Sequence, residues 1–333
     1  MEPNYIKLFL KFIFLLIINI RYFHFFTNRQ DSLLLERKSK ESFNNVILNN
    51  NNTNFEYFFC FCGIGKKENL YSRQLISYYL NLGVEKFVFG DNNEPNTEKL
   101  SDVLQDYISN GTVDIIDIIG SSIDQSKFYG ILYEKYNKRC EWLSFFDFDE
   151  YLVIRFEEGN NLALKEFLPN KIFDKCEAIV FNWLVYNDND LVYYDNRTIL
   201  ERFTKPSFED THNAFVKSIV RGNLDRKPFI DKKTNHRPVP EIKVCNSTGN
   251  LLLTYSEAYP PNYRNGYLIH FALKTAEEYI AKMLKGVCGG HKFNINHLEQ
   301  KVNFFFLHNK FTKEKLKVFE TYFNRTFDFY HDY

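Results

Sequence analysis

The composition of the chain does not by itself identify its class of protein. Six cysteines in 333 residues are too few for a disulfide scaffold. Cys60 and Cys62 would share one strand face, which favours core packing over a bridge. The others lack the paired spacing of a zinc site: Cys140, Cys176, Cys245 and Cys288. Which of them would pair in an oxidising compartment stays open.

The chain also lacks a charge imbalance. Lysine plus arginine and aspartate plus glutamate number 42 each, which gives a formal net charge of zero. Nucleic-acid binding depends largely on basic side chains that neutralise phosphates. The composition therefore predicts no nucleic-acid partner. No internal repeat of fixed period is found, so a solenoid or propeller is not expected.

The N-terminus lacks a long uninterrupted apolar run. Residues 8–26 are mainly Phe, Leu and Ile, but only residues 12–20 are free of charge. That is short for a spanning helix and fits a secretory signal. No alanine precedes Ala163 and no small-residue cleavage site lies near Arg21, so we favour an uncleaved signal anchor. A cleaved signal and an amphipathic leader remain alternatives.

This pattern predicts three parts of the chain. Residues 1–26 would be a signal anchor or transmembrane segment, and the Asn- and Ser-rich residues 27–54 a polar stem. Residues 55–333 would fold as one domain, with halves at about 55–150 and 151–333. The 44% hydrophobic and 18% aromatic content is ample for a core. We expect a single-pass membrane protein with a lumenal domain, in the Golgi or ER of a eukaryote.

The first half of that domain alternates strand and helix patterns. Short apolar runs alternate with segments of near-helical spacing, and Gly83 stops the first helix. This alternation predicts an α/β fold with a mostly parallel central sheet flanked by helices, which would bind ligands at the carboxyl ends of its strands. The expected strands are 55–62, 87–89 and 113–119, and the expected helices 66–82, 100–107 and 123–137.

An apolar run at residues 142–146 ends in the paired carboxylates Asp147 and Asp149, with Glu150 beside them. In an extended segment Asp147 and Asp149 would project to the same side, where a buried strand emerges into solvent. Hard oxygen ligands suit Mg²⁺ or Mn²⁺. Gly63-Ile64-Gly65 lacks the third glycine of a dinucleotide fingerprint, so a dinucleotide-binding loop is not expected.

Several segments in this order resemble the GT-A glycosyltransferases, most closely glycosyltransferase family 92 and the family 2-like domains. The likeness runs from about Phe55 to Gly286 and rests on these residues: 67–69, 82–87, 91–93, 142–150, 181–184, 216–221 and 269–279. It implies a Rossmann-like GT-A fold with additional acceptor-side strands at 178–186 and 191–203 and a helical cover from Thr275. It also implies an inverting, metal-dependent hexosyltransferase. The donor would be a nucleotide-diphosphate sugar and the acceptor a glycan, glycoprotein or glycolipid hydroxyl.

The resemblance also assigns roles to particular residues. Asp147, Asp149 and His270 would hold Mn²⁺ or Mg²⁺, since many GT-A enzymes bring a third ligand from the C-terminal side. Nucleotide-sugar contacts would come from Asp91 and Glu68. Lys274 would contact phosphate, or it would be a solvated first-turn lysine of a helix at 275–284. Each residue also has a plainer interpretation, as a turn, a helix start or a packed histidine.

The catalytic base and the reaction class leave more alternatives. Asp188 is preferred as the base, with Asp190, Glu201 and Asp210 as rivals, and all four are equally interpretable as loop residues. Further basic candidates favour a structural role: Lys217, Arg221, His236 and Arg237. A non-catalytic sugar- or metal-binding domain stays open. A phosphohydrolase fits less well because Tyr151 stands where such enzymes usually have Thr or Val. We expect Asp149→Ala to abolish turnover and to leave the melting temperature unchanged or higher.

Overall fold

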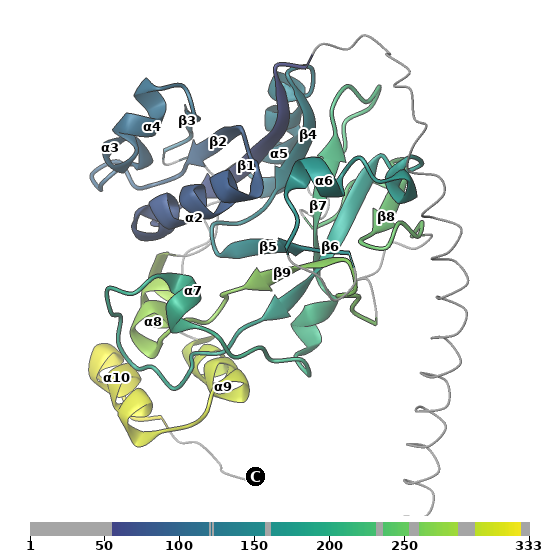
Figure 1. The fold of residues 1–333 in the computed structure, drawn as a ribbon. Coiled ribbons are helices and arrows are strands. Elements are labelled where there is room, and N and C mark those ends of the chain that lie inside the picture. The colour runs from purple at the N-terminus through teal and green to yellow at the C-terminus, as the bar shows by residue number, and fades with distance from the viewer. Residues whose placement is uncertain are drawn as a thin grey trace, which may run out of the picture. The chain divides into compact units, whose positions relative to one another are not determined.

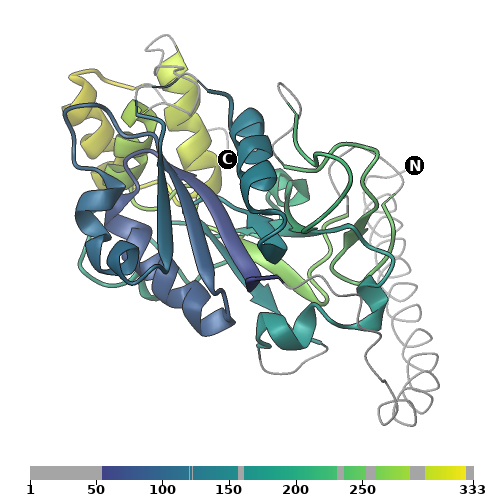
Figure 2. The same cartoon turned by 90° about the horizontal axis from the view of Figure 1, so that it is seen from above.

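The structure is a computed structural model, and it describes residues 55–327 apart from 120, 122, 157–160, 231–235, 253–259 and 286–296. Within this part, nine strands form one mixed sheet in the order β3-β2-β1-β4-β7-β6-β9-β5, and β8 also pairs with β6 (Figure 1). Helices cover both faces of its first half (Figure 2). Separate apolar clusters fill the core on the two faces of the sheet.

The first half of the sheet is parallel throughout, as predicted. Strand β1 lies between β2 and β4, and β2 also pairs with β3. Gly83 ends the first helix with φ of 99°, a conformation that only glycine adopts freely. The strands are β1 (Tyr57–Gly65), β2 (Lys86–Asp91), β3 (Val113–Asp117) and β4 (Cys140–Phe145).

The helices between these strands follow the prediction with one difference. Helix α2 (Asn69–Leu82) and α5 (Gln125–Tyr136) lie where the apolar spacing put them, and Asp124 caps α5 by accepting from the Ser126 backbone N–H. The single helix expected at 100–107 is instead two short helices, α3 (Leu100–Val103) and α4 (Gln105–Ser109), separated by Leu104.

The second half of the sheet is not mostly parallel, and there the prediction was wrong. Strand β7 (Val216–Arg221) is antiparallel to both β4 and β6 (Ala178–Val185). The first residues of β6 pair with β7 and β8 (Val244–Asn246), while its last three pair with β9 (Gly266–His270). Strand β5 (Glu150–Ile154) runs antiparallel to β9. The sheet curls because β6 changes partners partway along its length.

A second prediction also fails in this half. The strand expected at residues 191–203 is absent, and the short helix α7 (Ile199–Arg202) lies there instead. Thr198 and Glu201 form a capping box, in which Thr198 Oγ1 accepts from the Glu201 backbone N–H and Glu201 Oε2 accepts from the Thr198 backbone N–H at 2.8 Å. This reciprocal pair starts a helix and outweighs the strand-like apolar pattern.

The short elements that connect the strands are α6 (Leu164–Phe167) and the 3₁₀ turns η1 (Lys171–Phe173) and η2 (Thr211–Ala214). The C-terminal helices agree with the expected cover, and they are α8 (Ala276–Lys285), α9 (Leu298–His308) and α10 (Lys313–Phe323). They share an apolar cluster of their own that includes Val185 from β6. Figure 1 shows them grouped beside the end of the sheet that holds β9.

Disulfides form across neighbouring elements. Cys60 on β1 pairs with Cys140 on β4, and Cys176 pairs with Cys245 on β8. The expectation that Cys60 serves core packing without a bridge was therefore wrong, because β1 and β4 are adjacent. Cys62 is buried and free. Cys288 lies outside the described residues.

The predicted anchor at 1–26 and stem at 27–54 also lie outside the described residues. Within the part that the structure describes, no helix has both the length and the apolar character that a membrane crossing needs.

Candidate active site

The carboxylates Asp147 and Asp149 lie in the turn that joins β4 to β5, rather than along an extended strand. The register of β5 with β9 places His270 opposite Glu150. The Phe271 backbone N–H donates to the Asp149 carbonyl at 2.9 Å, which continues this pairing into the turn. As a result His270 Nε2 lies 3.6 Å from Asp149 Oδ1. The structure thus brings His270 to Asp149 at one edge of the sheet, and Asp147 lies two residues away in the same turn.

Asp147 is held by groups from three other elements. Lys217 on β7 lies 2.8 Å from Asp147 Oδ2, and Gln125 on α5 donates to Oδ1 at 2.7 Å. The Tyr129 hydroxyl lies 3.3 Å from the same Oδ1. The Asp147 backbone N–H donates to Glu150 Oε2 at 2.8 Å. The orientation of Asp147 is fixed, although 32% of its side chain remains exposed.

Asp149 is surrounded by cations and is buried. Lys282 on α8 lies 2.9 Å from Asp149 Oδ2 and also donates to the Ala272 carbonyl at 2.9 Å. Lys274 approaches the same Oδ2 to 3.9 Å. A third of the Lys282 side chain is exposed, whereas Lys274 is buried. The pair of carboxylates therefore faces several positive charges.

Electrostatics sets the protonation of this cluster. Burial opposes ionisation of Asp149, but Lys282 and His270 outweigh it and hold the pKa of Asp149 well below its ordinary value. Burial raises the pKa of Glu150 well above its ordinary value. Burial would lower the pKa of Lys217, yet Asp147 and Glu150 raise it. Burial lowers the pKa of His270, so its imidazole is neutral near pH 7 and can act as a ligand.

Aromatic rings form the wall next to His270. The Trp183 ring centroid lies 4.0 Å from that of His270, and His236 packs against Trp183 at 5.2 Å. Burial, together with the Lys217 charge, lowers the pKa of His236 to about 4. His236 therefore stays neutral near pH 7 beside the cluster, and Trp183 separates it from His270.

Asp91 and Glu68 lie at the carboxyl ends of β2 and β1. Asp91 Oδ1 accepts from the Asn93 backbone N–H at 3.0 Å, and Oδ2 accepts from the Leu100 backbone N–H at 2.7 Å. Asp91 thus shapes the turn that follows β2, as its plainer interpretation proposed. Glu68 is buried at the start of α2, where its side chain does not cap the helix.

Lys274 lies in the link between β9 and α8, and not in the first turn of a helix, which was the plainer interpretation. Its φ of 58° is a left-handed conformation that costs energy for a residue with a side chain. Its amine lies 4.5 Å above the Tyr71 ring. Helix α8 begins afterwards, and Thr275 caps it by accepting from the Glu278 backbone N–H.

Asp188 pairs with the C-terminal helices. Its carboxylate lies 2.5 Å from Lys315 on α10, and its backbone N–H donates to Asn309 Oδ1 at 2.8 Å. Burial raises the pKa of Asp188 in spite of Lys315. Among its rivals, Asp190 pairs with Lys205 at 3.1 Å and Glu201 belongs to the capping box. The role of Asp188 as base stays a prediction.

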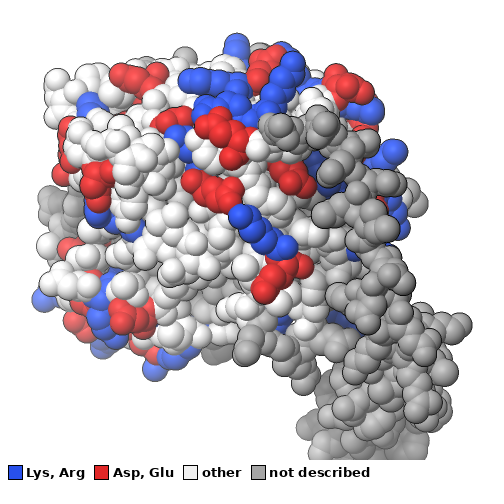
Figure 3. Space-filling model, turned by 45° about the horizontal axis from the view of Figure 1, so that its top comes forward, with Lys and Arg blue, Asp and Glu red and all other residues white. Residues whose placement is uncertain are grey.

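Sequence reasoning missed Gln125 and Lys282 and favoured a structural role for Lys217. Lys217 is a fully buried lysine on a strand that also carries Val216, Ile219 and Val220, and that contrast was the available signal. Gln125 and Lys282 lie on helices with no distinguishing pattern, and only the fold brings them to Asp147 and Asp149. On the face drawn in Figure 3, basic and acidic side chains are interspersed.

Comparison with known proteins identifies the chain. The profile of glycosyltransferase family 92 matches residues 55–226, more than half of the 333 residues. No curated protein matches the chain. Solved structures include residues 1–349 of TarS from S. aureus, with 14% identity over 74% of this chain and 70% of that one, at a TM-score of 0.31. Another structure of S. aureus TarS gives 11% identity over 79% of this chain and 48% of that one, at a TM-score of 0.34.

The profile match shows that this α/β chain is a glycosyltransferase. The chain belongs to glycosyltransferase family 92.

Proposed function

We propose that this protein transfers a sugar from a nucleotide-diphosphate donor to a hydroxyl of a glycan or glycoconjugate, with a Mn²⁺ or Mg²⁺ ion held by Asp147, Asp149 and His270. One observation supports the proposal: His270 Nε2 lies 3.6 Å from Asp149 Oδ1 at the β4–β5 turn, which also carries Asp147, at the carboxyl end of the parallel half of the sheet. Open α/β sheets bind their ligands at this edge.

The donor set fits such an ion. Two ionised carboxylates and one neutral imidazole give a mixed oxygen and nitrogen shell, which suits Mn²⁺. A protonated lysine has no lone pair and cannot serve as a ligand. Lys282, a third of whose side chain is exposed, would have to leave Asp149 when an ion binds. Lys217 is fully buried and would stay beside Asp147.

The same lysines account for binding of the diphosphate. When bound, a divalent ion neutralises the negative charge that develops on a departing nucleoside diphosphate. Lys282, once released, would remain close enough to donate to a phosphate oxygen. Lys274 is buried beside Asp149 and offers a second positive charge. These two side chains would bind and orient the leaving group.

The remaining site residues have supporting roles in this proposal. Asp91 accepts from two backbone N–H groups, so it would position the turn at the nucleotide pocket. Glu68, at the adjacent strand end, would lie near the nucleoside. Inversion needs a carboxylate base, and Asp188 remains the candidate although its pairing with Lys315 would have to open. We also propose that residues 1–26 anchor the enzyme in a membrane with the domain in the lumen.

The test incubates the full chain with a panel of nucleotide-diphosphate sugars and Mn²⁺ and measures released nucleoside diphosphate. We expect one donor to give slow hydrolysis without acceptor and faster release with a suitable glycan. The anomeric configuration of the product, read by NMR, should be opposite to that of the donor. Asp106→Asn is the matched control, since Asp106 is an exposed carboxylate paired with Arg73. Release of inorganic phosphate from monoesters, or no reaction with any donor, would contradict the proposal.

A further inference from the structure

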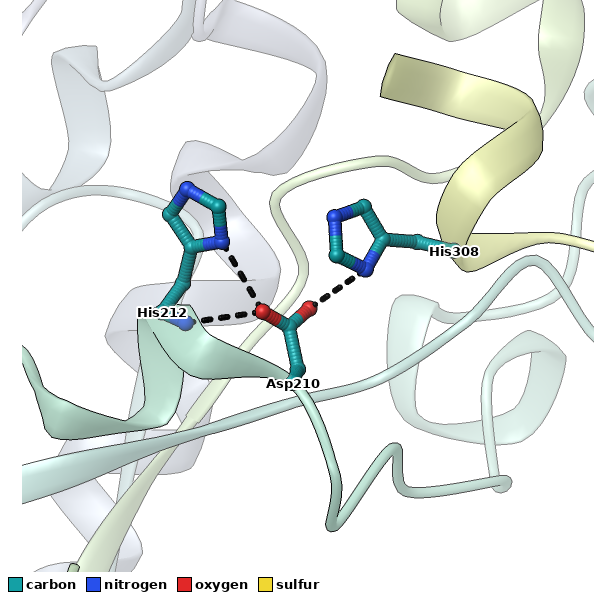
Figure 4. A group of neighbouring side chains, drawn as sticks. All are labelled: Asp210, His212 and His308. Atoms are coloured by element: carbon teal, nitrogen blue, oxygen red, sulfur yellow. Dashed lines mark hydrogen bonds and ion pairs between the residues drawn. The ribbon is translucent and has the colours of Figure 1, made fainter. Parts of the chain in front are cut away.

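A second cluster of metal-ligating side chains lies outside the site described above. Asp210, His212 and His308 converge from η2 and from the end of α9 (Figure 4). His212 Nδ1 lies 2.8 Å from Asp210 Oδ1, and His308 Nδ1 lies 2.8 Å from Asp210 Oδ2. The two imidazoles therefore face the two oxygens of one carboxylate.

Asp210 is rigid and ionised. It precedes η2, and its Oδ1 also accepts from the His212 backbone N–H at 2.8 Å. Its side chain is 1% exposed. Burial alone would raise the pKa of Asp210, but hydrogen bonds from His308 and His212 hold it below its ordinary value. A buried, oriented carboxylate of this kind is a prepared oxygen ligand.

The two histidines differ in their access to solvent. His308 is buried and packs against Phe304, with ring centroids 4.6 Å apart. His212 packs on the same Phe304 ring at 5.1 Å, yet 37% of its side chain is exposed. The cluster is thus closed on the His308 side and open to solvent on the His212 side. An ion could enter from that side and keep water at its free positions.

We propose that Asp210, His212 and His308 bind a divalent transition-metal ion of the Zn²⁺ type, separate from the catalytic ion. One ligand atom from each residue lies within 4.8 Å of the others. Ligands about 2.1 Å from a tetrahedral Zn²⁺ ion are about 3.4 Å apart, so each histidine, now 2.8 Å from its own oxygen of Asp210, would have to move away by about 0.6 Å. Two imidazoles and one carboxylate make a set with open positions, which suits a transition metal better than Mg²⁺.

The ion would join parts of the fold that are distant in sequence. It would tie α9 to the η2 segment between β6 and β7. From His212, ring contacts lead to Phe215 at 5.8 Å, then to Trp183 at 5.3 Å. Trp183 contacts His270. The second ion would therefore stabilise the aromatic wall of the catalytic site, and its binding does not depend on the proposed transferase reaction.

The same three residues could instead hold protons between their nitrogen and oxygen atoms, as a hydrogen-bonded triad. In the described part of the chain, His308 Nε2 is buried without a hydrogen-bond partner. This would hold both for the metal-bound cluster and for the hydrogen-bonded triad. It therefore does not separate the two states. Direct measurement of metal content does separate them.

The experiment strips the full chain of metal with EDTA, equilibrates it with Zn²⁺ or Co²⁺, and measures bound metal by mass spectrometry after gel filtration. Asp147→Asn/Asp149→Asn should retain one tightly bound equivalent, and His308→Gln and His212→Gln should lose it, with affinity falling roughly 100-fold or more. His297→Gln, at the exposed start of α9, is the matched control and should retain it. Near-saturating Zn²⁺ should raise the melting temperature by about 5 °C in wild type and not in His212→Gln.

Two results would overturn the proposal. One is an equal metal content in wild type, His212→Gln and His308→Gln. The other is loss of all tightly bound metal in Asp147→Asn/Asp149→Asn, which would assign the ion to the catalytic site. Because His212 is partly exposed, His212→Gln should fold even if His308→Gln does not. Co²⁺ absorption in the visible region would report a four- or five-coordinate ion directly.

Discussion

Two carboxylate clusters in this enzyme differ in the cations that face them. Asp147 and Asp149 face Lys217, Lys274 and Lys282, whereas Asp210 faces two imidazoles. A protonated lysine can only compensate charge, so an ion that binds Asp149 would have to displace Lys282. A neutral imidazole can itself become a ligand. The comparison indicates that lysine partners suit a carboxylate that binds an ion together with a diphosphate and then releases it. Histidine partners suit a carboxylate that retains its metal.

Turnover should separate the two clusters most strongly. Asp149→Asn removes a proposed metal ligand whose charge would be needed as the diphosphate departs, so we expect the turnover number to fall roughly 100- to 1,000-fold. His212→Gln should lower it less than about 10-fold, because its effect is structural. Nucleoside diphosphate release under Mn²⁺ measures both. Equal losses in the two variants would remove the distinction between the clusters.

The pH dependence of stability tests the wall beside the catalytic cluster. The folded-state pKa of His236 is about 4, against an ordinary value of 6.5. Between these pH values the unfolded chain binds more protons, so stability is full above pH 6.5 and falls as the pH decreases toward 4. Denaturant unfolding of wild type should show this loss of stability. In His236→Gln the loss should be smaller, by at most about 3 kcal/mol. Parallel pH profiles of the two proteins would show that His236 titrates normally.

The structure leads to a different expectation for the stability of Asp149→Ala from the one made from sequence. Repulsion between paired carboxylates predicted an unchanged or higher melting temperature. The structure instead surrounds Asp149 with Lys282, Lys274 and His270, and Asp149→Ala removes the carboxylate that these groups face, including the ion pair with Lys282. We expect the free energy of unfolding to fall by about 2 kcal/mol. An unfolding curve that matches wild type would restore the original expectation.

The smallest effect concerns Lys282. Because Lys282 competes with an ion for Asp149, Lys282→Met should lower the Mn²⁺ concentration for half-maximal activity by about 5-fold, which corresponds to about 1 kcal/mol. The measurement is a Mn²⁺ titration of activity at fixed donor. Lys165→Met is a suitable control, since Lys165 forms an exposed pair with Glu85. A higher Mn²⁺ requirement would instead show that Lys282 supports the binding of the ion and does not compete with it.

Local pattern predicted the parallel half of the fold and the position of Asp147 and Asp149. Apolar spacing and Gly83 are local signals, and they located β1 to β4 and α2. The second half depends on long-range pairing, because β6 changes partners and β9 brings His270 to Asp149. Residue types alone do not specify such pairing. The Cys60–Cys140 bridge and the meeting of Asp210 with His308 have the same origin.

One failed prediction did have a local signal. Residues 191–203 were expected to form an acceptor-side strand. Thr198 and Glu201 have the spacing of a capping box, which predicts a helix start. Giving that pair more weight would have located α7. By contrast, no pattern around Lys282 distinguishes it from other helix lysines, so its contact with Asp149 required the structure.

Electron paramagnetic resonance of Mn²⁺ tests the central claim most directly. The full chain is titrated with Mn²⁺ in the presence of UDP or GDP, and free Mn²⁺ is read from its signal. For one of the two nucleotides, wild type and His308→Gln should bind one Mn²⁺ equivalent that Asp147→Asn/Asp149→Asn does not bind. Equal Mn²⁺ binding by wild type and the double variant with both nucleotides would contradict a catalytic ion at these carboxylates.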